Sequence, residues 1–150
     1  MTQTPHQERS LVTTAAKVVG AVFLLVGILG FIPGITSNYS SLSFAGHMSE
    51  AKLLGVFQVS ILHNIVHLLF GVAGIAMAKR ADSARTYLVG GGIIYLVLWI
   101  YGLLTSDQSS ANFVPVNTAD DWLHLVLGLG MIALGVLLSR RRVESTTTTR

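Results

Sequence analysis

The chain has 150 residues, of which 51% are hydrophobic and 11% charged, and its mean hydropathy is +0.64. Soluble domains carry roughly 25% charged residues, and one this small could not hide so much apolar surface from water. The net charge is +3, but basic residues stand in short clusters beside hydrophobic runs, which argues against nucleic acid as a partner. Because the chain has no cysteine, disulfides, thiolate metal ligands and thiol catalysis are excluded.

Four apolar segments follow one another along the chain, each close to the ~20 residues that a helix needs to cross a bilayer. The predicted helices cover residues 15–34, 60–78, 86–104 and 117–139. The alternating polarity of transmembrane β-strands is missing. No A-x-A-like site follows the first segment, so we expect no cleavable signal peptide. The sequence predicts an all-α protein, a polytopic membrane four-helix bundle with the lipid bilayer as its solvent.

Basic residues predict the orientation of these helices. Lys and Arg flank the first helix, the turn at 79–85 and the end of the fourth helix, where Arg140, Arg141 and Arg142 stand. The loops 35–59 and 105–116 offer only Lys52. By the positive-inside rule both termini should be cytoplasmic and both longer loops outside. Residues 1–14 and 140–150 are predicted to be cytoplasmic tails, the second basic and then disordered.

The first outer loop contains one segment with helical potential, "SEAKLL". Ser49 could cap a short interfacial helix there, with Leu53, Leu54 and Phe57 lying on lipid. An ordered coil over the mouth of the bundle is the alternative.

An internal repeat appears when His67 is aligned with His124. "HLLFGVAGIA" then falls on "HLVLGLGMIA", which pairs Gly71 with Gly128. The first and third helices correspond too, with Gly20 on Gly92, Phe23 on Tyr95 and Gly30 on Gly102. The sequence therefore predicts two tandem helix–outer loop–helix units of the same orientation, related by a pseudo-twofold axis along the membrane normal.

Small and polar residues share one stripe on the second helix and one on the fourth. His63, His67, Gly71 and Gly74 lie on one face at ~100° per residue, and Asp120, His124, Gly128, Met131 and Gly135 lie on another. Glycines let helix backbones approach closely in lipid. We therefore expect both stripes, with their histidines, to face protein and not acyl chains.

At this point the residues resemble a known family. "HNIVHLLFGVAGIA", "YLVGGGIIYLVLWIYGLL" and "NFVPVNTADDWLHLVLGLGMIALG" are similar to an uncharacterised four-helix membrane family, common in actinobacteria and defined only as a domain of unknown function. The similarity covers about residues 15–139. It implies a four-span fold in the bacterial plasma membrane and supplies no activity or catalytic residue.

The polar residues at the helix starts have a structural explanation. Ser60 and Asn117 are good N-cap types, and His63 and Asp120 then occupy the third helical position, where an acid complements the free amides. Asp121 is likewise explained as an acid of the first turn.

His67 and His124 lie deeper, each about 10 Å inside its helix, and three accounts compete for them. They could hydrogen-bond across helices to Tyr95, Tyr101, Asn64 or a carbonyl. They could join His63 and Asp120 as ligands of a zinc-like metal, since His63 and His67 are spaced i, i+4. They could also be the axial ligands of a b-type haem, which would require the helices to part.

No nucleophile has a local catalytic signature, and no charge lies near mid-span, which disfavours a proton pump. The sequence therefore predicts a non-enzymatic structural, sensory or complex-forming membrane protein, packing with itself or with a larger complex. The alternative is a metal- or haem-binding redox protein using His63, His67, His124 and Asp120. A dimeric transporter is the third class, without the broken helices typical of one.

Overall fold

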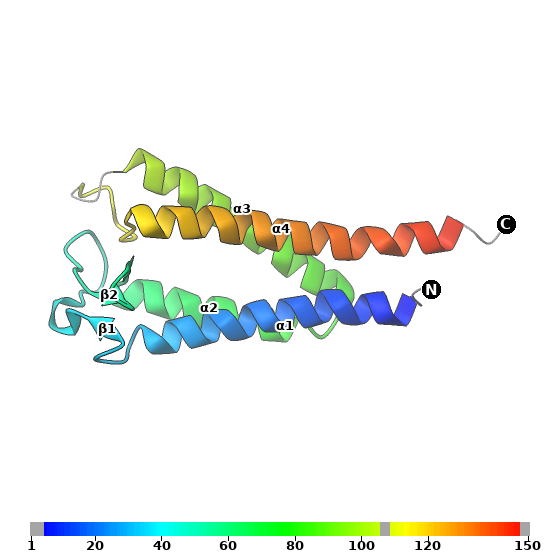
Figure 1. The fold of residues 1–150 in the computed structure, drawn as a ribbon, viewed down its shortest axis with the longest axis horizontal. Helices are drawn as coiled ribbons and strands as arrows, with labels where there is room; N and C mark the ends of the chain where they lie inside the picture. Colours follow the sequence, from blue (N-terminus) through cyan, green and yellow to red (C-terminus); the bar gives the residue numbers. More distant parts are fainter. Residues whose placement is uncertain (1–4, 106–108, 148–150) are drawn as a thin grey trace.

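Four helices make up most of the structure. The computed structural model describes residues 5–105 and 109–147, with side chains between Leu11 and Ser139 of those ranges. The helices are α1 (Pro5–Leu29), α2 (Ile61–Met77), α3 (Ala81–Leu104) and α4 (Thr118–Thr147). α1 packs most closely with α2 and α3 with α4 (Figure 1). The described ends of α1 and α4 lie with the α2–α3 turn at one end of the bundle, and the longer connections lie at the other (Figure 1).

α1 is displaced toward the N-terminus relative to its predicted bounds. It begins at Pro5, a residue favoured at the first helical position, and ends at Leu29 instead of residue 34. Pro33 explains the early end, because a proline disfavours helical backbone at the residue before it. The predicted tails 1–14 and 140–150 are helical backbone over 5–14 and 140–147, while residues 1–4 and 148–150 lie outside the described residues.

Three of the four helices are long and apolar enough to cross a membrane: α1 from Leu11, α3, and α4 as far as Ser139. α2 has 17 residues and falls below that length. It is short because Ser60 caps its start and the turn at 78–80 leads directly into α3. α3 begins at Ala81, five positions before its predicted start, since the Ser83 hydroxyl donates to the Met77 carbonyl at 2.8 Å and closes that turn.

The predicted interfacial helix at "SEAKLL" is wrong. Residues 36–58 form a three-stranded antiparallel sheet of β1 (Thr36–Ser37), β2 (Lys52–Leu53) and β3 (Phe57–Gln58). Leu53 is buried in it and not laid on lipid. The turn after β2 explains the strand, because Leu54 (φ 54°) and Gly55 (φ 73°) both adopt left-handed backbone that stops a helix.

Ser49 does not cap a helix; its side chain cross-links residues 43–59 through hydrogen bonds. Its hydroxyl donates to the Val59 carbonyl at 2.6 Å and accepts from the Ser43 amide at 3.3 Å. Residues 35–59 therefore form a folded layer over the ends of α1 and α2. We call this layer the outer cap, because it lies at the end of the bundle away from the described chain ends (Figure 1). The all-α prediction thus holds for the bundle, and the small sheet is its exception.

Glycines bring the helices of each pair into backbone contact. A Cβ on Gly20 of α1 would lie 2.9 Å from the carbonyl oxygen of Gly71 in α2. In the other pair, a Cβ on Gly92 of α3 would lie 2.7 Å from the carbonyl oxygen of Gly128 in α4. Farther out, Gly30 faces Asn64 and Gly102 faces Asp121. The predicted glycine-mediated packing is confirmed, and the same types of contact occur in both helix pairs.

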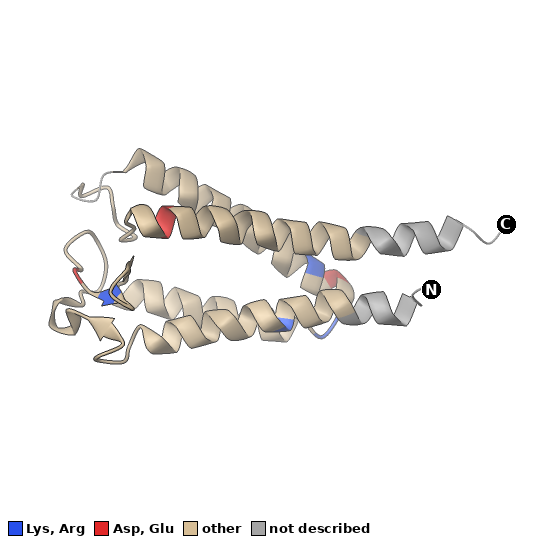
Figure 2. Cartoon of the chain, in the orientation of Figure 1, with Lys and Arg blue, Asp and Glu red and all other residues tan. Residues whose placement is uncertain are grey.

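The outside of the bundle is apolar along its length. Exposed aliphatic residues lie on every helix, among them Val18 and Leu25 on α1, Leu69 on α2, Val97 on α3 and Val126 on α4. Charged residues gather near the two ends of the helices (Figure 2). In water this surface would be an association hazard, whereas in lipid it is the expected exterior.

Candidate functional site

The helix starts carry the caps that the sequence predicts. The Ser60 hydroxyl accepts from the His63 amide at 3.1 Å. Asn117 Oδ1 accepts from the amides of Ala119 (2.9 Å) and Asp120 (3.0 Å), and the Asp120 carboxylate returns a bond by accepting from the Asn117 amide at 3.0 Å. This reciprocal pair is a capping box with an aspartate in the usual glutamate position. Ser60 and Asn117 are therefore confirmed as N-caps.

The three predicted histidines are buried among the helices. His63 and His67 are each 9% exposed, and His124 is 3% exposed. The rings of His63 and His67 lie 4.4 Å apart between centroids. The expectation that these side chains face protein is confirmed. We call His63, His67 and His124 the imidazole cluster.

Aromatic rings fill the space around the imidazole cluster. Phe23 contacts His67 with ring centroids 5.5 Å apart, and Tyr95 contacts His124 at 5.3 Å. Phe23 and Tyr95 stack on each other at 5.3 Å with an interplanar angle of 23°. The four rings form one series, His67–Phe23–Tyr95–His124, across the centre of the bundle. A porphyrin between the two histidines would have to displace both central rings, so this geometry disfavours the haem alternative.

The hydrogen bonds of the cluster differ from those predicted. His67 Nδ1 pairs with the His63 carbonyl of its own helix at 3.0 Å. Nδ1 of His63 and Nδ1 of His124 have no hydrogen-bond partner among the described residues. Tyr101 serves another purpose, because its hydroxyl donates to the Ala111 carbonyl at 2.5 Å and accepts from the Phe113 amide at 2.7 Å.

The four predicted metal ligands do not converge. Within the described residues, no group of three or more His, Asp or Glu side chains is arranged to hold a metal ion. Asp120, 2% exposed, uses its Oδ2 to accept from two backbone amides, those of Asn117 and Gln58. A metal at His63, His67 and His124 would therefore require side chains to move.

The same bond from Gln58 to Asp120 joins two distant parts of the chain. The backbone amide of Gln58, in β3 of the outer cap, donates at 3.0 Å to the Asp120 carboxylate at the start of α4. Beside it, the side-chain amide of Asn117 donates through Nδ2 to the Val56 carbonyl at 2.9 Å. These two bonds, which we call the latch, fasten the cap carried by α1 and α2 onto the hairpin of α3 and α4.

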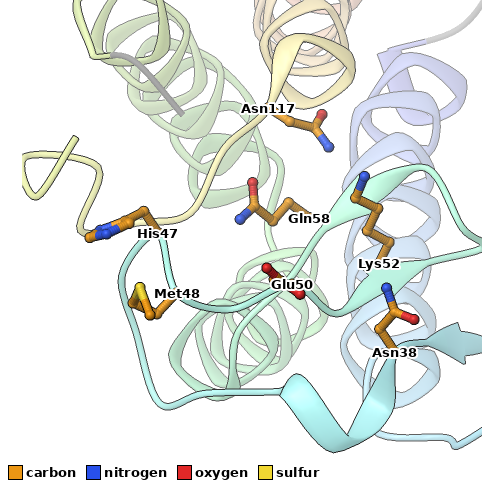
Figure 3. A pocket seen from close by; sticks show the side chains of 7 residues that line it. All are labelled: Asn38, His47, Met48, Glu50, Lys52, Gln58 and Asn117. Carbon is orange, nitrogen blue, oxygen red and sulfur yellow. The ribbon is translucent and has the colours of Figure 1, made fainter. Parts of the chain in front are cut away.

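A polar cavity of about 320 Å³ opens next to the latch. Glu50, Lys52 and Gln58 of the cap line it, together with Asn117 of the latch (Figure 3). Its rim also includes Asn38, His47 and Met48 (Figure 3).

This cavity could not be predicted from the sequence. Its residues come from loop and strand segments without helical periodicity, so no pattern joined them. The one available signal was the alternation Glu50–Ala51–Lys52, a charged, apolar, charged sequence that is typical of a half-buried strand.

Fold and site together define a class. An apolar four-helix bundle with three helices of membrane-spanning length and a folded polar cap at one end is compatible with an integral membrane protein. The profile of one family matches residues 13–137, and the chain belongs to that family, described as a domain of unknown function (DUF4383). The resemblance drawn from the sequence is thereby confirmed. No curated protein and no solved structure matches the chain.

Proposed function

We propose that the chain is a non-enzymatic, multi-pass protein of the bacterial plasma membrane that works at the outer face as a sensor. Both termini lie in the cytoplasm and the outer cap faces outward. The clusters of Lys and Arg beside the α2–α3 turn and in the C-terminal part of α4 support this orientation, because basic residues are enriched in cytoplasmic flanks. In this role it packs with itself or with a larger membrane complex.

The latch carries this proposal. The inner end of the bundle has only a short turn between α2 and α3, whereas the outer end has a folded cap with its own sheet, its own buried residues and a polar cavity. Asp120 and Asn117 connect that cap to α4. A molecule that contacts the cap therefore acts on the position of one hairpin relative to the other, which is the two-state element that a sensor needs.

The two hairpins are further proposed to be tandem copies related by a pseudo-twofold axis along the membrane normal. The Gly20–Gly71 contact corresponds to Gly92–Gly128 in the aligned sequences. The ring pair Phe23–His67 likewise corresponds to Tyr95–His124. The stacking of Phe23 on Tyr95, which are aligned with each other, is what an axis passing between them would produce.

Cysteine accessibility tests the orientation, and the natural chain has no cysteine to interfere. Ser40→Cys and Ser110→Cys introduce thiols at exposed sites of the two longer connections, and Asp82→Cys introduces one beside the α2–α3 turn. A membrane-impermeant maleimide should label the first two in intact spheroplasts and Asp82→Cys only after permeabilisation. The reverse pattern, or opposite sidedness for Ser40→Cys and Ser110→Cys, would overturn the proposal.

The sensor role has its own test. Cysteines at Val18 and Val97, on the exposed faces of α1 and α3, can carry a pair of spin labels whose separation reports the relative position of the two hairpins. Asp120→Ala, which removes the Gln58–Asp120 bond of the latch, should change the measured distance distribution, while Asp82→Ala should leave it unchanged. Identical distributions in all three proteins would show that the cap does not set hairpin position.

A second candidate function, metal binding, is favoured by one observation: the unpartnered Nδ1 atoms of His63 and His124. Buried polar atoms without partners are uncommon, and a cation would satisfy both. Elemental analysis of natively purified protein should then find stoichiometric zinc or a similar metal that is lost in His63→Ala. A Soret band lost in His67→Ala would instead support haem. If the natural protein contains no stoichiometric metal and shows no Soret band, this candidate is rejected.

A further inference from the structure

The cavity beside the latch combines two opposite charges that do not neutralise each other. Glu50 and Lys52 both line it, and no ion pair joins either side chain to another described residue. Figure 3 shows both side chains beside the same cavity, with the Lys52 ammonium turned toward Asn117. Unpaired groups of both signs in one hollow are the complement of a ligand that itself carries both.

Strand geometry holds these two charges on one side. Glu50 and Lys52 are separated by Ala51, which is fully buried. Because side chains alternate across extended backbone, burying the middle residue turns both charged neighbours to the opposite face, with Cα atoms roughly 7 Å apart. The Val59 amide donates to the Ala51 carbonyl at 3.0 Å, which continues the pairing of β2 with β3 by one residue and holds this stretch in place.

A third group completes the recognition surface. Gln58 pairs with Lys52 across β2 and β3, which places both side chains on the same face of the sheet. Its Nε2 donates to the Ser49 carbonyl at 2.7 Å, which fixes the orientation of the amide. No hydrogen bond of the described residues uses its Oε1, so this atom is available as a second acceptor in the cavity.

We propose that this cavity binds a small free amino acid, with the ligand ammonium on Glu50 and Gln58 Oε1 and the ligand carboxylate on Lys52. One acid and one base make the lining formally neutral, which disfavours a bare anion or a bare cation. The volume of about 320 Å³ is at the lower end of ligand pockets, and its walls are polar, so the ligand is small. This inference rests on the outward-facing cap of the proposed function and names its ligand class.

Calorimetric titration of the full chain in nanodiscs tests the site, since both faces are then accessible. L-Alanine is the probe, and ethylamine and propionate each present one of its two charges. L-Alanine should bind saturably, with ethylamine and propionate at least tenfold weaker. Glu50→Gln and Lys52→Met should each weaken L-alanine binding about tenfold or more, because each removes one charge-assisted hydrogen bond.

Matched controls and a rescue variant separate recognition from folding. Asp82→Asn and Lys79→Met remove the same charges at the opposite end of the bundle and should leave binding unchanged. The double exchange of Glu50→Lys with Lys52→Glu should recover part of the lost affinity by binding the ligand in reverse. Glu50 and Lys52 are exposed, so all variants should have the same melting temperature as the natural protein.

Three results would overturn the site: no saturable heat with L-alanine or glycine, propionate or ethylamine binding as tightly as L-alanine, or unchanged affinity in both charge variants. Failure of the orientation is a separate outcome. If L-alanine binds to the chain in nanodiscs but not in intact spheroplasts, the site is supported and the cap lies on the cytoplasmic side.

Discussion

Gln58 and Asp120 lie 62 positions apart in the chain, yet the amide of the first donates to the carboxylate of the second at 3.0 Å in a buried setting. The same Oδ2 accepts from the Asn117 amide. One carboxylate therefore closes the N-terminus of α4 and holds the outer cap in place. The local role could be read from the sequence, while the distant role depends on the fold.

Removing that carboxylate should destabilise the protein. Asp120→Ala deletes two charge-assisted hydrogen bonds and leaves the Gln58 amide buried without an acceptor, so we expect a loss of about 2–4 kcal/mol in the free energy of unfolding. Asp120→Asn keeps one acceptor oxygen, so its free energy of unfolding should lie between those of the natural protein and Asp120→Ala. Thermal unfolding in detergent, followed by circular dichroism, gives the order. Asp82→Ala at the other end of the bundle is the control, and an equal loss there would refute the assigned role.

Two glycines of one helix provide a matched pair for the packing of α3 on α4. A Cβ on Gly92 would meet the Gly128 carbonyl at 2.7 Å, whereas one on Gly90 would meet nothing within 4 Å. Gly92→Ala should therefore cost about 1–3 kcal/mol through overpacking. Gly90→Ala should be neutral or stabilising by up to about 1 kcal/mol, since alanine favours helix. The melting temperatures of the two variants should move in different directions, and equal shifts would contradict the close approach.

The ring series predicts a difference between two replacements of His124. His124→Phe keeps an aromatic ring against Tyr95 and removes a polar atom that has no hydrogen-bond partner among the described residues, so stability should change by less than about 1 kcal/mol. His124→Ala leaves a cavity and should cost about 2–4 kcal/mol. Denaturation in detergent measures both. If phenylalanine is as damaging as alanine, a polar contact of the imidazole, and not its packing, supports the fold.

Tyr101 predicts the behaviour of the second outer connection. Its hydroxyl contacts the Ala111 carbonyl and the Phe113 amide, so Tyr101→Phe should release both groups. Hydrogen exchange at residues 109–114 should accelerate severalfold, as local opening becomes cheaper. Tyr39→Phe is the control, because no hydrogen bond of the described residues uses the Tyr39 hydroxyl. If residues 109–114 are equally protected from hydrogen exchange in the natural protein and in Tyr101→Phe, the Tyr101 hydroxyl does not hold this connection.

Helical periodicity carried most of what the sequence could predict. The faces of α2 and α4 are correct down to His67 and His124, because burial on a helix repeats every 3.6 residues and the glycines mark the side of closest approach. The caps Ser60 and Asn117 were equally readable, since capping acts within three residues. The tandem-repeat arrangement stays a prediction that the paired contacts support.

The outer cap was beyond such reasoning. Its strands have two residues each, too few for a period, and their pairing depends on the left-handed turn at Leu54 and Gly55. The latch and the hydroxyl of Tyr101 join segments whose proximity only the fold creates. The early end of α1 at Leu29, by contrast, could have been read from Pro33.

The length of α2 bears on the lipid around the protein. Its 17 residues rise about 26 Å, a few ångströms less than a hydrocarbon layer of about 30 Å. In the proposed membrane topology, acyl chains beside this helix compress, or its Ser60 end sits below the headgroups, where no water is available to amide groups. The hydroxyl of Ser60 and the backbone carbonyls of Ser43 and Phe44 accept from those amides. This loop of the cap thus takes the place of interfacial water, and in the proposed topology the membrane is expected to be thinnest along this one side of the bundle.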